Sequence, residues 1–390
     1  MTRKLFYEDS YMKRFSAVVT ECQKDGEQYR VVLDRTAFFP EGGGQYADTG
    51  LLGDVEVTDV REQEGTIYHM TKAALEPGIQ VNGRINWQER FMKMQQHTGE
   101  HIVSGLVHAG FGYDNVGFHL GSTDCTMDFN GEISEEELLE IEQQANEALV
   151  QNLEVEVSYP SEAELQRLEY RSKIEIEGQV RIVTIPGYDV CACCAPHVGR
   201  TGEIGQIKLT HVQRYKGGVR VTMLCGFRAL ADYNRKLQAT RRISAALCAK
   251  EDETAEAVER LQEEYANLKQ MYAQLQKELL KHKANAVETG EEVVCLFEPE
   301  LTGEAPRFLM NQVLEAGHRV CAVFFGAEGD TYRYVIGSAK VDLREVVGEL
   351  NAVFHGRGGG KPEMVQGSLS GKEEELRGWM KEKVRILYHE

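Results

Sequence analysis

The chain has 390 residues, of which 42% are hydrophobic and 27% charged, and its formal net charge at pH 7 is −18. This length predicts roughly two to four domains with buried cores. No run of about 18 apolar residues occurs, and the first residues lack the apolar segment of a signal peptide, so we expect neither a transmembrane helix nor secretion. Nine cysteines, of which only Cys191, Cys193 and Cys194 cluster, indicate a reduced, cytoplasmic protein and exclude a disulfide framework.

Residues 1–86 contain short apolar segments separated by turn residues, which predicts a small β-barrel or sandwich. The expected strands are Ala17–Thr20, Tyr29–Leu33, Val55–Val60, Thr66–His69 and Gln80–Ile85. Between the second and third of them, the segment Thr36–Gly50 reads TAFFPEGGGQYADTG. Its three consecutive glycines permit positive φ angles and a close approach of the backbone to a ligand. The flanking phenylalanines and proline favour a packed loop over a flexible hairpin tip.

The sequence of residues 87–225 predicts a mixed α/β domain that opens with a helix from Trp87 to His108. This helix carries His97 and His101, which are four residues apart and therefore share one face. Histidines at this spacing also occur as ordinary surface residues, so the pair alone is weak evidence for a metal site. The remaining expected elements are the strands Phe118–Leu120, Cys125–Phe129, Gly205–Leu209 and Gly218–Cys225 and a helix from Ser134 to Val150 that starts with a capping box.

A second pair with metal-type side chains, Cys193 and His197, lies about ninety-five residues further on in the string CACCAPH. Nearby prolines and glycines place this pair on a turn or loop. A set of thiolate and imidazole ligands suits zinc better than other common metals. We therefore predict a Zn²⁺ site formed by His97, His101, Cys193 and His197, with Cys191 or Cys194 as alternative thiolates.

Basic residues are concentrated between Gly205 and Lys250, where ten lysines and arginines accompany one acid, Asp232. The average charge of the chain argues against a nucleic-acid partner, but acidic surfaces elsewhere would steer a polyanion towards this basic segment. We predict nucleic-acid contacts by Arg214, Lys216 and Arg220. Solvated charges on ordinary strands and a helix are the alternative.

Residues 226–288 are predicted to be helical. Seven apolar residues alternate spacings of three and four, as in the seam of a coiled coil: Val258, Leu261, Tyr265, Leu268, Tyr272, Leu275 and Leu279. This seam would pair either with the helix 226–249 or with another subunit, which would make the protein a homodimer.

Residues 289–390 are predicted to form a separate α/β domain. The expected strands are Val293–Phe297, Arg319–Phe325 and Tyr332–Ile336, and the expected helices are Arg307–Ala316 and Leu343–Phe354. A second glycine-rich loop, HGRGGGKP at residues 355–362, presents Arg357 and Lys361 as candidate phosphate ligands. It lacks the spacing of a P-loop, and a tight turn between a strand and a helix is the alternative.

These motifs, in this order, resemble those of a known family. The strings FFPEGGGQYADTG, the HxxxH pair and the CxxxH pair followed by TGEIG are similar to the editing part of alanyl-tRNA synthetases and to free-standing alanyl-tRNA editing proteins. The string FHGRGGGKPEMVQG resembles the DHH-associated domain of such synthetases. The synthetases usually have Cys-Gly-Gly-Thr-His where this chain has Cys-Cys-Ala-Pro-His, so the ligand spacing is kept while the intervening residues differ.

The resemblance implies an α+β multidomain fold with four parts: an N-terminal β-barrel (1–86), a zinc-binding editing domain (87–225), a helical coiled-coil linker (226–288) and a DHH-associated-like domain (289–390). It also implies a cytoplasmic trans-editing hydrolase that deacylates alanine tRNA mischarged with serine or glycine. The aminoacylation pocket of a synthetase for alanine cannot strongly reject such amino acids. One added hydroxyl or one missing methyl group changes the binding free energy by only about 1–3 kcal/mol. A separate hydrolytic site then supplies the missing discrimination.

Several residues are candidates for the chemistry of such a site. Gln45, Gly43 and Gly44 in the first glycine-rich loop and His119 are candidates for substrate contact, and Glu100 is a weak candidate for a catalytic group. Zinc would either be held by three of its four ligands, with water or substrate in the fourth position, or be closed and structural. We favour the open arrangement.

Two other functions are compatible with parts of the sequence. The string HTGEH matches the HxxEH pattern of metallopeptidases, with Glu100 as general base and Glu175 or Glu177 as third ligand, but it leaves the CxxxH pair unexplained. A non-catalytic tRNA- or RNA-binding protein with structural zinc is the other alternative.

Overall fold

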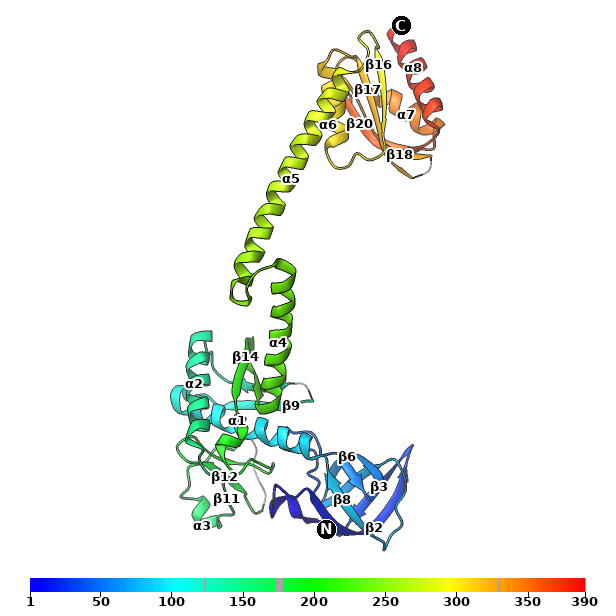
Figure 1. Cartoon of the computed structure of the whole chain (residues 1–390). Helices are drawn as coiled ribbons and strands as arrows, with labels where there is room; N and C mark the ends of the chain where they lie inside the picture. The colour runs from blue at the N-terminus through cyan, green and yellow to red at the C-terminus, as the bar shows by residue number, and fades with distance from the viewer. Residues whose placement is uncertain (123, 173–177, 329, 390) are drawn as a thin grey trace. The chain divides into compact units, whose positions relative to one another are not determined.

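The computed structural model describes residues 1–122, 124–172, 178–328 and 330–389 (Figure 1). The chain divides into two compact units, Met1–Arg242 and Ile243–Glu390, and the boundary between them falls inside the predicted helical linker. Among the described residues, no helix is long and apolar enough to cross a membrane.

The first unit begins with a closed six-stranded barrel in which the strand order is β2-β3-β7-β6-β5-β8. Buried and exposed residues alternate along the first half of β2 and along β8, as expected for strands with one face towards a core. The barrel strands are β2 (Arg14–Asp25), β3 (Gln28–Leu33), β5 (Gly50–Leu52), β6 (Val55–Gln63), β7 (Thr66–Thr71) and β8 (Gln80–Ile85); the short β1 (Arg3–Lys4) and β4 (Arg35–Thr36) pair with each other, and a 3₁₀ turn covers Leu5–Tyr7.

The remainder of the first unit holds two small antiparallel sheets and a long central helix, α1 (Trp87–Phe111). One sheet has the order β14-β15-β10-β9, and the other has the order β11-β12-β13. The strands are β9 (Asn115–Leu120), β10 (Cys125–Phe129), β11 (Glu156–Ser158), β12 (Ile182–Ile185), β13 (Asp189–Ala192), β14 (Ile207–Tyr215) and β15 (Gly218–Cys225). The other helices here are α2 (Glu135–Gln151), the short α3 (Glu162–Leu165) and a 3₁₀ turn at Thr201–Ile204.

Helix α1 is buried over most of its length, polar side chains included. It packs against α2 and against strands of both sheets, so it occupies the centre of the unit. The packing is close enough that a side chain at Gly105 would lie 2.1 Å from the backbone oxygen of Tyr188. The helix is followed by Gly112, which adopts the left-handed conformation favoured by glycine after a helix. Helix α2 starts with the predicted capping box, in which Ser134 and Glu137 satisfy each other's backbone N–H groups.

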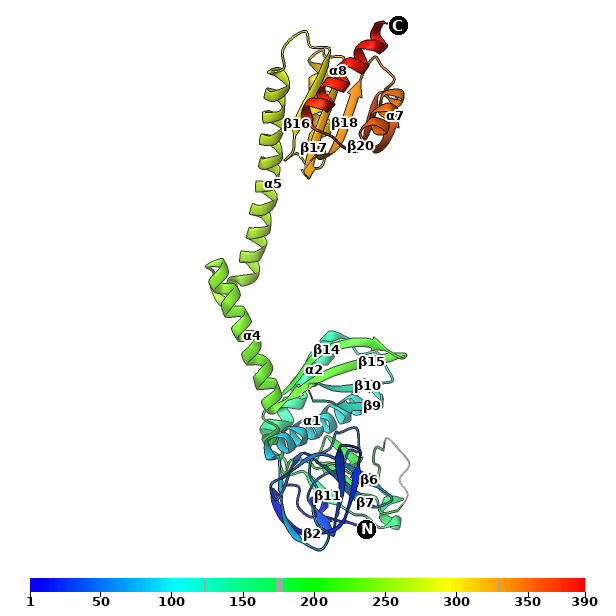
Figure 2. The same ribbon diagram turned by 90° about the vertical axis from the view of Figure 1, so that its right-hand side faces the viewer.

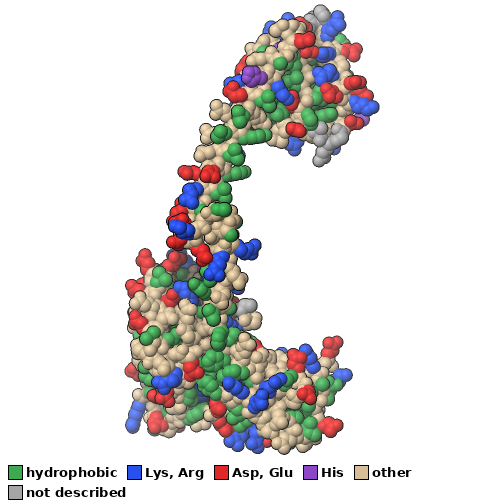
Figure 3. All heavy atoms as spheres, in the orientation of Figure 1, with side chains coloured by type: hydrophobic (Ala, Val, Ile, Leu, Met, Phe, Trp, Pro, Cys, Tyr) green, Lys and Arg blue, Asp and Glu red, His purple; other side chains and the backbone are tan. Residues whose placement is uncertain are grey.

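Two further helices follow, α4 (Gly226–Leu247) and α5 (Thr254–Asn285), with a 3₁₀ turn at Glu251–Glu253 between them. The seven residues of the predicted seam lie on α5, where their exposed fractions range from 38% to 67%. Figure 3 shows apolar side chains along this helix. The last turns of α5 differ, because Leu280 and Ala284 are buried against α6 and its sheet.

The second unit has a five-stranded sheet in the order β16-β17-β18-β20-β19, in which only the β16–β17 pair is parallel. Helix α6 and the end of α5 contribute to one core cluster, while α7 and α8 contribute to another (Figures 1 and 2). The strands are β16 (Val293–Glu298), β17 (Val320–Glu328), β18 (Thr331–Ser338), β19 (Arg357–Lys361) and β20 (Met364–Ser370), and the helices are α6 (Ala305–Glu315), α7 (Leu343–Val353) and α8 (Glu373–His389).

The prediction of a second glycine-rich loop at residues 355–362 is wrong, because Arg357–Lys361 forms the edge strand β19. The glycines let this strand approach its neighbours closely: a side chain at Gly358 would lie 2.4 Å from the backbone oxygen of Gln366. Glycine runs usually mark loops, and here the same residue type serves close strand packing. Arg357 and Lys361 are exposed at the sheet edge.

Candidate metal centre

The structure brings His97, His101, Cys193 and His197 together, with one ligand atom from each lying within 4.8 Å of all the others. The two histidines of α1 face the loop that follows β13, where the cysteine and the third histidine lie. The Sγ atom of Cys193 is 3.4 Å from Nε2 of His97 and 3.4 Å from Nε2 of His197. The three histidines are at most 3% exposed. Three imidazoles and one thiol converging in a buried space form a donor set that suits zinc.

Each of the three imidazoles is oriented by a partner at its other nitrogen. His97 Nδ1 lies 3.1 Å from Gln45 Oε1, His101 Nδ1 lies 2.8 Å from Asp189 Oδ2, and His197 Nδ1 lies 3.1 Å from the Thr98 hydroxyl. Such contacts fix the ring orientation and leave Nε2 available as a ligand atom, as is usual around metal-binding histidines. Spacing in the sequence did not reveal these partners, which come from three different elements.

The three clustered cysteines occupy different environments. Burial acts to raise the pKa of Cys193, but the imidazoles of His97 and His197 hold it well below its usual range. Burial raises the pKa of Cys191 and of Cys194 to about 11. Since a thiolate is the form that binds metals, Cys193 is the thiol best prepared to be a ligand.

Behind His101, Asp189 connects the cluster to Arg171. Burial would raise the pKa of Asp189, but hydrogen bonds from His101 and Arg171 hold it below its usual value. Arg171 Nε donates to Asp189 Oδ1 at 2.8 Å. Burial opposes protonation of His101, yet its hydrogen bond to Asp189 keeps its pKa well above the usual range. Cys191 groups with His101 and Asp189 on this side of the imidazole rather than with the other histidines.

The first glycine-rich segment reaches the cluster as a packed loop. Phe38 and Phe39, which are at most 2% exposed, anchor it in the barrel core. Beyond them, the backbone N–H of Leu120 donates to the Gly44 oxygen at 2.8 Å, which docks the loop on β9. Gln45 is then 1% exposed, its oxygen contacts His97, and its Nε2 has no hydrogen-bond partner among the described residues. A buried amide donor without a partner is costly and is a common mark of a ligand site.

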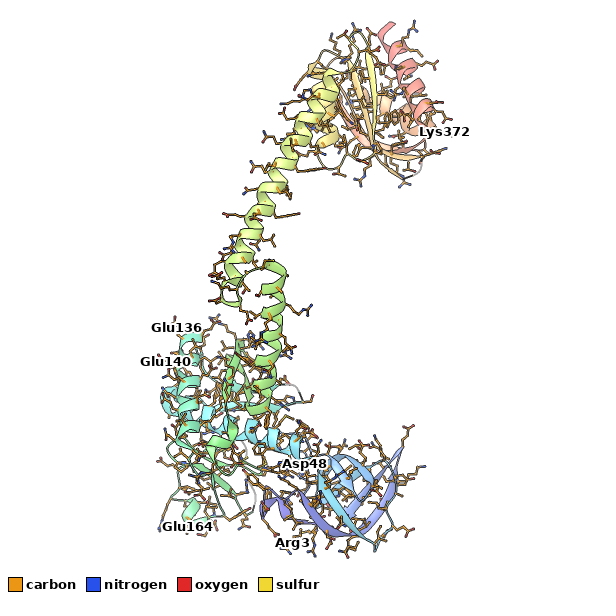
Figure 4. The ribbon with its side chains drawn as sticks, viewed as in Figure 1. Arg3, Asp48, Glu136, Glu140, Glu164 and Lys372 are labelled. Atoms are coloured by element: carbon orange, nitrogen blue, oxygen red, sulfur yellow. The ribbon has the colours of Figure 1, made fainter. Side chains whose placement is uncertain are left out.

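A buried ion pair fixes the far end of this loop. Arg90 on α1 makes hydrogen bonds to Asp48, to the Ala37 oxygen and to the Ser10 oxygen, and it is completely buried. Asp48 also accepts a hydrogen bond from the backbone N–H of Phe39 at 2.8 Å. Figure 4 shows Asp48 where the barrel meets α1. The segment that carries Gln45 is therefore held between the barrel and α1.

A pocket of about 460 Å³ opens beside the loop. It is lined by Glu41, Gly42, Gly44, Gln45, Tyr46, His119, Leu120, Gly121 and Ser122. His119 is exposed on β9, so it belongs to the pocket wall and not to the buried cluster. Gly43 does not line this pocket and lies next to the cluster instead. A side chain added there would be 3.3 Å from the Cys194 sulfur and 3.8 Å from the His97 ring. All four predicted substrate-contact residues thus surround the cluster or its pocket.

Glu100 is completely buried beside the cluster. Its Oε1 accepts hydrogen bonds from Ser104 at 2.6 Å and Asn115 at 2.7 Å, and its Oε2 lies 3.9 Å from His101 Nε2. The carboxylate is thus held rigidly next to the ligand atoms. Glu175 and Glu177, the third ligands expected for a peptidase, lie outside the described residues.

The predicted basic residues differ in their surroundings. Arg220 makes two hydrogen bonds to Asp128, at 2.6 and 2.7 Å, which offset part of its charge. Arg214 is 87% exposed and lies 3.8 Å from Glu132, and Lys216 is exposed in the turn between β14 and β15. Arg214 and Lys216 are the more accessible of these cations.

Three family models match the chain. They are "tRNA synthetases class II (A)" at residues 5–89, "Threonyl and Alanyl tRNA synthetase second additional domain" at residues 180–222, and "DHHA1 domain" at residues 290–385. The second match ends a few residues before β15 does and includes Cys193 and His197.

Two kinds of curated relatives match. The alanine–tRNA ligase of Pyrococcus abyssi is 30% identical over 94% of this chain, but the match spans only 42% of the ligase. The alanyl-tRNA editing protein AlaX-L of Pyrococcus horikoshii is 28% identical over 99% of both chains, and Aarsd1 of Rattus norvegicus, also named an alanyl-tRNA editing protein, is 28% identical over 93% of both.

The matches and the fold agree on one class, the tRNA-editing proteins built from a synthetase-type editing unit and a DHHA1 domain. Within that class, the chain belongs to the family of alanyl-tRNA editing proteins. It spans less than half the length of the alanine–tRNA ligases that it matches.

Proposed function

We propose that this protein is a cytoplasmic trans-editing hydrolase that removes serine, and also glycine, from mischarged alanine tRNA. The observation that carries the proposal is the amide nitrogen of Gln45, which has no hydrogen-bond partner among the described residues, while the amide oxygen contacts His97 of a three-histidine, one-cysteine cluster. In this arrangement a hydrogen-bond donor lies next to four side chains that could bind a metal ion. Ester hydrolysis requires both a means of activating water and a donor for the developing oxyanion.

The donor set fits Zn²⁺, which His97, His101, Cys193 and His197 would hold. The chemistry that such an ion supplies is polarisation of the ester carbonyl and a lower pKa for bound water. Three protein ligands are usual where water or substrate takes the fourth position, whereas four are usual in a structural site. We favour the open arrangement, in which one of the four side chains yields its place to substrate.

The residues around the cluster have separate roles in the proposed reaction. Gln45 Nε2 donates to the substrate ester or to the terminal adenosine. Gly43 and Gly44 let the loop backbone pass close to Cys194 and Phe118, so that the loop reaches the substrate, and His119 lines the pocket. Glu100, held by Ser104 and Asn115, is the candidate proton acceptor because its Oε2 lies 3.9 Å from a ligand atom.

The test is deacylation of serine-charged, glycine-charged and correctly charged alanine tRNA, with zinc content measured on the same samples. We expect loss of serine and glycine but not of alanine. Cys193→Ala should lose both zinc and activity, whereas Cys194→Ala should keep its zinc. Gln45→Ala should keep zinc and lose about 100-fold in rate, the usual effect of removing one oxyanion donor.

Two outcomes would move the assignment elsewhere. An intact ester with normal zinc content would contradict the hydrolase and favour a non-catalytic tRNA-binding protein, which protects the ester. Peptide hydrolysis that survives Cys193→Ala and is lost in Glu100→Gln would favour the metallopeptidase.

The proposed partners are tRNA and a second copy of the chain. For tRNA, Arg214, Lys216 and Arg220 in the first unit and Arg357 and Lys361 in the second are the proposed contacts. For the homodimer, the support is the exposed seam of α5. Among its seven residues, every second one is a leucine, namely Leu261, Leu268 and Leu275. Leucine at these d positions is typical of two-stranded parallel coiled coils.

Charges beside the seam favour the parallel orientation. In a parallel pair, Glu264 at a g position would face Lys269 of the other copy at an e position. Glu264→Lys should therefore weaken the dimer about tenfold, since two exposed pairs become repulsive. Glu263→Lys, one position away on the outer face, is the matched control and should change nothing. Sedimentation of the full chain is the measurement, and a monomer at every concentration would contradict the dimer.

A further inference from the structure

The start of α4 is held by contacts with α1 and with Tyr46, a residue that lines the pocket beside Gln45. The backbone N–H of Gly226 donates to the Gln206 oxygen at 2.9 Å, and a side chain at this glycine would lie 2.3 Å from Gln95 of α1. Arg228, in the first turn, donates to the Tyr46 hydroxyl at 3.3 Å and to the Asp124 oxygen at 3.5 Å. Tyr46 and Gly121 line the pocket, and the backbone N–H of Gly121 donates to the Asp124 oxygen at 2.9 Å. The first turn of this helix therefore lies beside the pocket.

Three large apolar side chains are exposed on the first turns of the same helix. Phe227 is 54% exposed, Leu230 is 50% exposed and Tyr233 is 61% exposed. The opposite side is anchored, because Ala229 and Asp232 are at most 9% exposed. The three exposed residues follow one another at intervals of three, so they form a continuous stripe over two turns. Adjacent large apolar side chains that are exposed to solvent on a well-anchored helix indicate a binding surface.

The charge of the helix selects the kind of partner. Between Gly226 and Arg242 the chain has five basic residues and one acid, Asp232, although the protein as a whole is strongly acidic. That acid is shared by Arg235 and Lys236, at 2.5 and 2.7 Å. Helix α5 gives the contrast, since its five acids and five basic residues balance. Flat apolar rings among cations suit a polyanion that has exposed ring faces, which describes single-stranded nucleic acid.

We propose that the stripe Phe227–Leu230–Tyr233 is a stacking platform for the unpaired 3′ end of the RNA substrate. Bases stack on Phe227 and Tyr233, and Arg228 contacts the backbone at the pocket mouth. The platform presents the terminal aminoacyl ester to the space between Gln45 and the metal-type cluster. This inference rests on the proposed function for the identity of the RNA, but the surface itself is defined by exposure, anchoring and charge.

The experiment measures the affinity of the full-length protein for two RNAs: an acceptor-stem duplex with an unpaired 3′ ACCA end, and the same duplex with a blunt end. For the overhang RNA, Phe227→Ala and Tyr233→Ala should each weaken binding about tenfold, in line with the loss of one stacked base. The blunt RNA should be affected little. Phe227→Trp should restore binding, because it keeps a ring. Leu139→Ala on α2 is the matched control, since Leu139 is 62% exposed but lies outside the platform.

The outcomes separate the platform from the proposed reaction. If the protein cleaves no ester but binds the overhang RNA in a manner that requires Phe227 and Tyr233, the hydrolase fails and the platform stands. If the protein deacylates tRNA while both alanine variants bind the overhang RNA as the native protein does, the platform is refuted. Equal loss of the blunt and overhang RNAs would also refute it, because the surface would then recognise duplex rather than single strand. Unchanged RNA affinity together with loss of a protein partner would assign the stripe to that protein.

Discussion

The two glycine-rich segments of the chain look alike in sequence but have different structures. Gly42–Gly44 belongs to a loop that leaves the barrel and docks on β9, and Gly43 and Gly44 have φ angles of +61° and +78°. Gly358–Gly360 lies in the edge strand β19, in which none of the three has a positive φ. In the first segment glycine permits the backbone to turn, and in the second it permits strands to approach. Composition alone does not separate these two uses.

The segments also differ in what holds them. The first is clamped by buried polar contacts at both ends, with Thr36 hydrogen-bonded to His69 before it and Asp48 bound to Arg90 after it. The second is held by the regular ladder between β19 and β20. We therefore expect the first segment to depend on individual side chains and the second to tolerate many single changes.

The largest effect should come from Asp48→Ala. This change leaves the guanidinium of Arg90 buried without its counter-ion, and breaking a buried ion pair in this way costs about 3–5 kcal/mol. The free energy of unfolding from denaturant titration is the measurement. Glu56→Ala is the matched control, since Glu56 forms an ion pair with Lys72 while both side chains are more than half exposed, and its loss should cost less than about 1 kcal/mol. Equal losses in the two variants would show that the clamp is unimportant.

A slightly smaller effect should follow acidification, through His69. Burial lowers the pKa of His69 in the folded protein to about 4, whereas the unfolded value is about 6.5. The folded state thus disfavours the charged form, so its contribution to stability is complete above pH 6.5. That contribution is lost as the pH falls from 6.5 towards 4, by up to about 3 kcal/mol.

The measurement is unfolding of the native protein and of His69→Gln across this pH range. The native protein should lose more stability on acidification than the variant does, because the variant has no imidazole to protonate. Parallel curves would rule out a coupling between His69 and the barrel. Zinc content should be recorded at each pH, so that loss of metal is not mistaken for protonation in the barrel.

The sequence predicted most elements with regular patterns. The helix from Trp87 was expected to end at His108 and ends at Phe111, and the strands Cys125–Phe129 and Gly218–Cys225 have the predicted bounds. These elements have long apolar periodicities or clear turn residues at their ends. The strands β5, β11, β12 and β13, for which no bounds were predicted, have only three or four residues, too few for a periodicity to show. The strand β19 was missed because glycine usually disfavours strands.

At the candidate site, local sequence spacing predicted only the four candidate ligands. His97 and His101 lie on one helical face, and Cys193 and His197 have the same spacing, so their convergence could be predicted. The partners that orient the imidazoles could not, because Asp189 is 88 residues from His101 and Thr98 is 99 residues from His197. Such contacts depend on how β13 and the following loop pack on α1, which no local pattern encodes. Asp48 belongs to the quoted segment TAFFPEGGGQYADTG, but the sequence did not predict that Asp48 pairs with Arg90, 42 residues further on.

The smallest effects, of opposite sign, should come from single alanines in the two glycine segments. Gly44→Ala forces a residue with a side chain into a left-handed conformation and brings its Cβ 2.6 Å from the Phe118 oxygen, so it should cost about 1–2 kcal/mol. Gly359→Ala meets nothing within 4 Å, and a strand loses less backbone entropy with alanine than with glycine, so it should be neutral or stabilise by about 0.5 kcal/mol.

Activity should separate the same two variants more clearly than stability does. Gly44→Ala displaces the loop that holds Gln45 against His97, so ester hydrolysis should fall while zinc content stays normal. Gly359→Ala should leave hydrolysis unchanged. Gly358→Ala extends the comparison within one strand, since its Cβ would lie 2.4 Å from the Gln366 oxygen and should destabilise the second unit without touching the site. If Gly359→Ala and Gly358→Ala behaved alike, close packing of β19 on its neighbours would not explain its glycines, and the contrast between the two segments would fail.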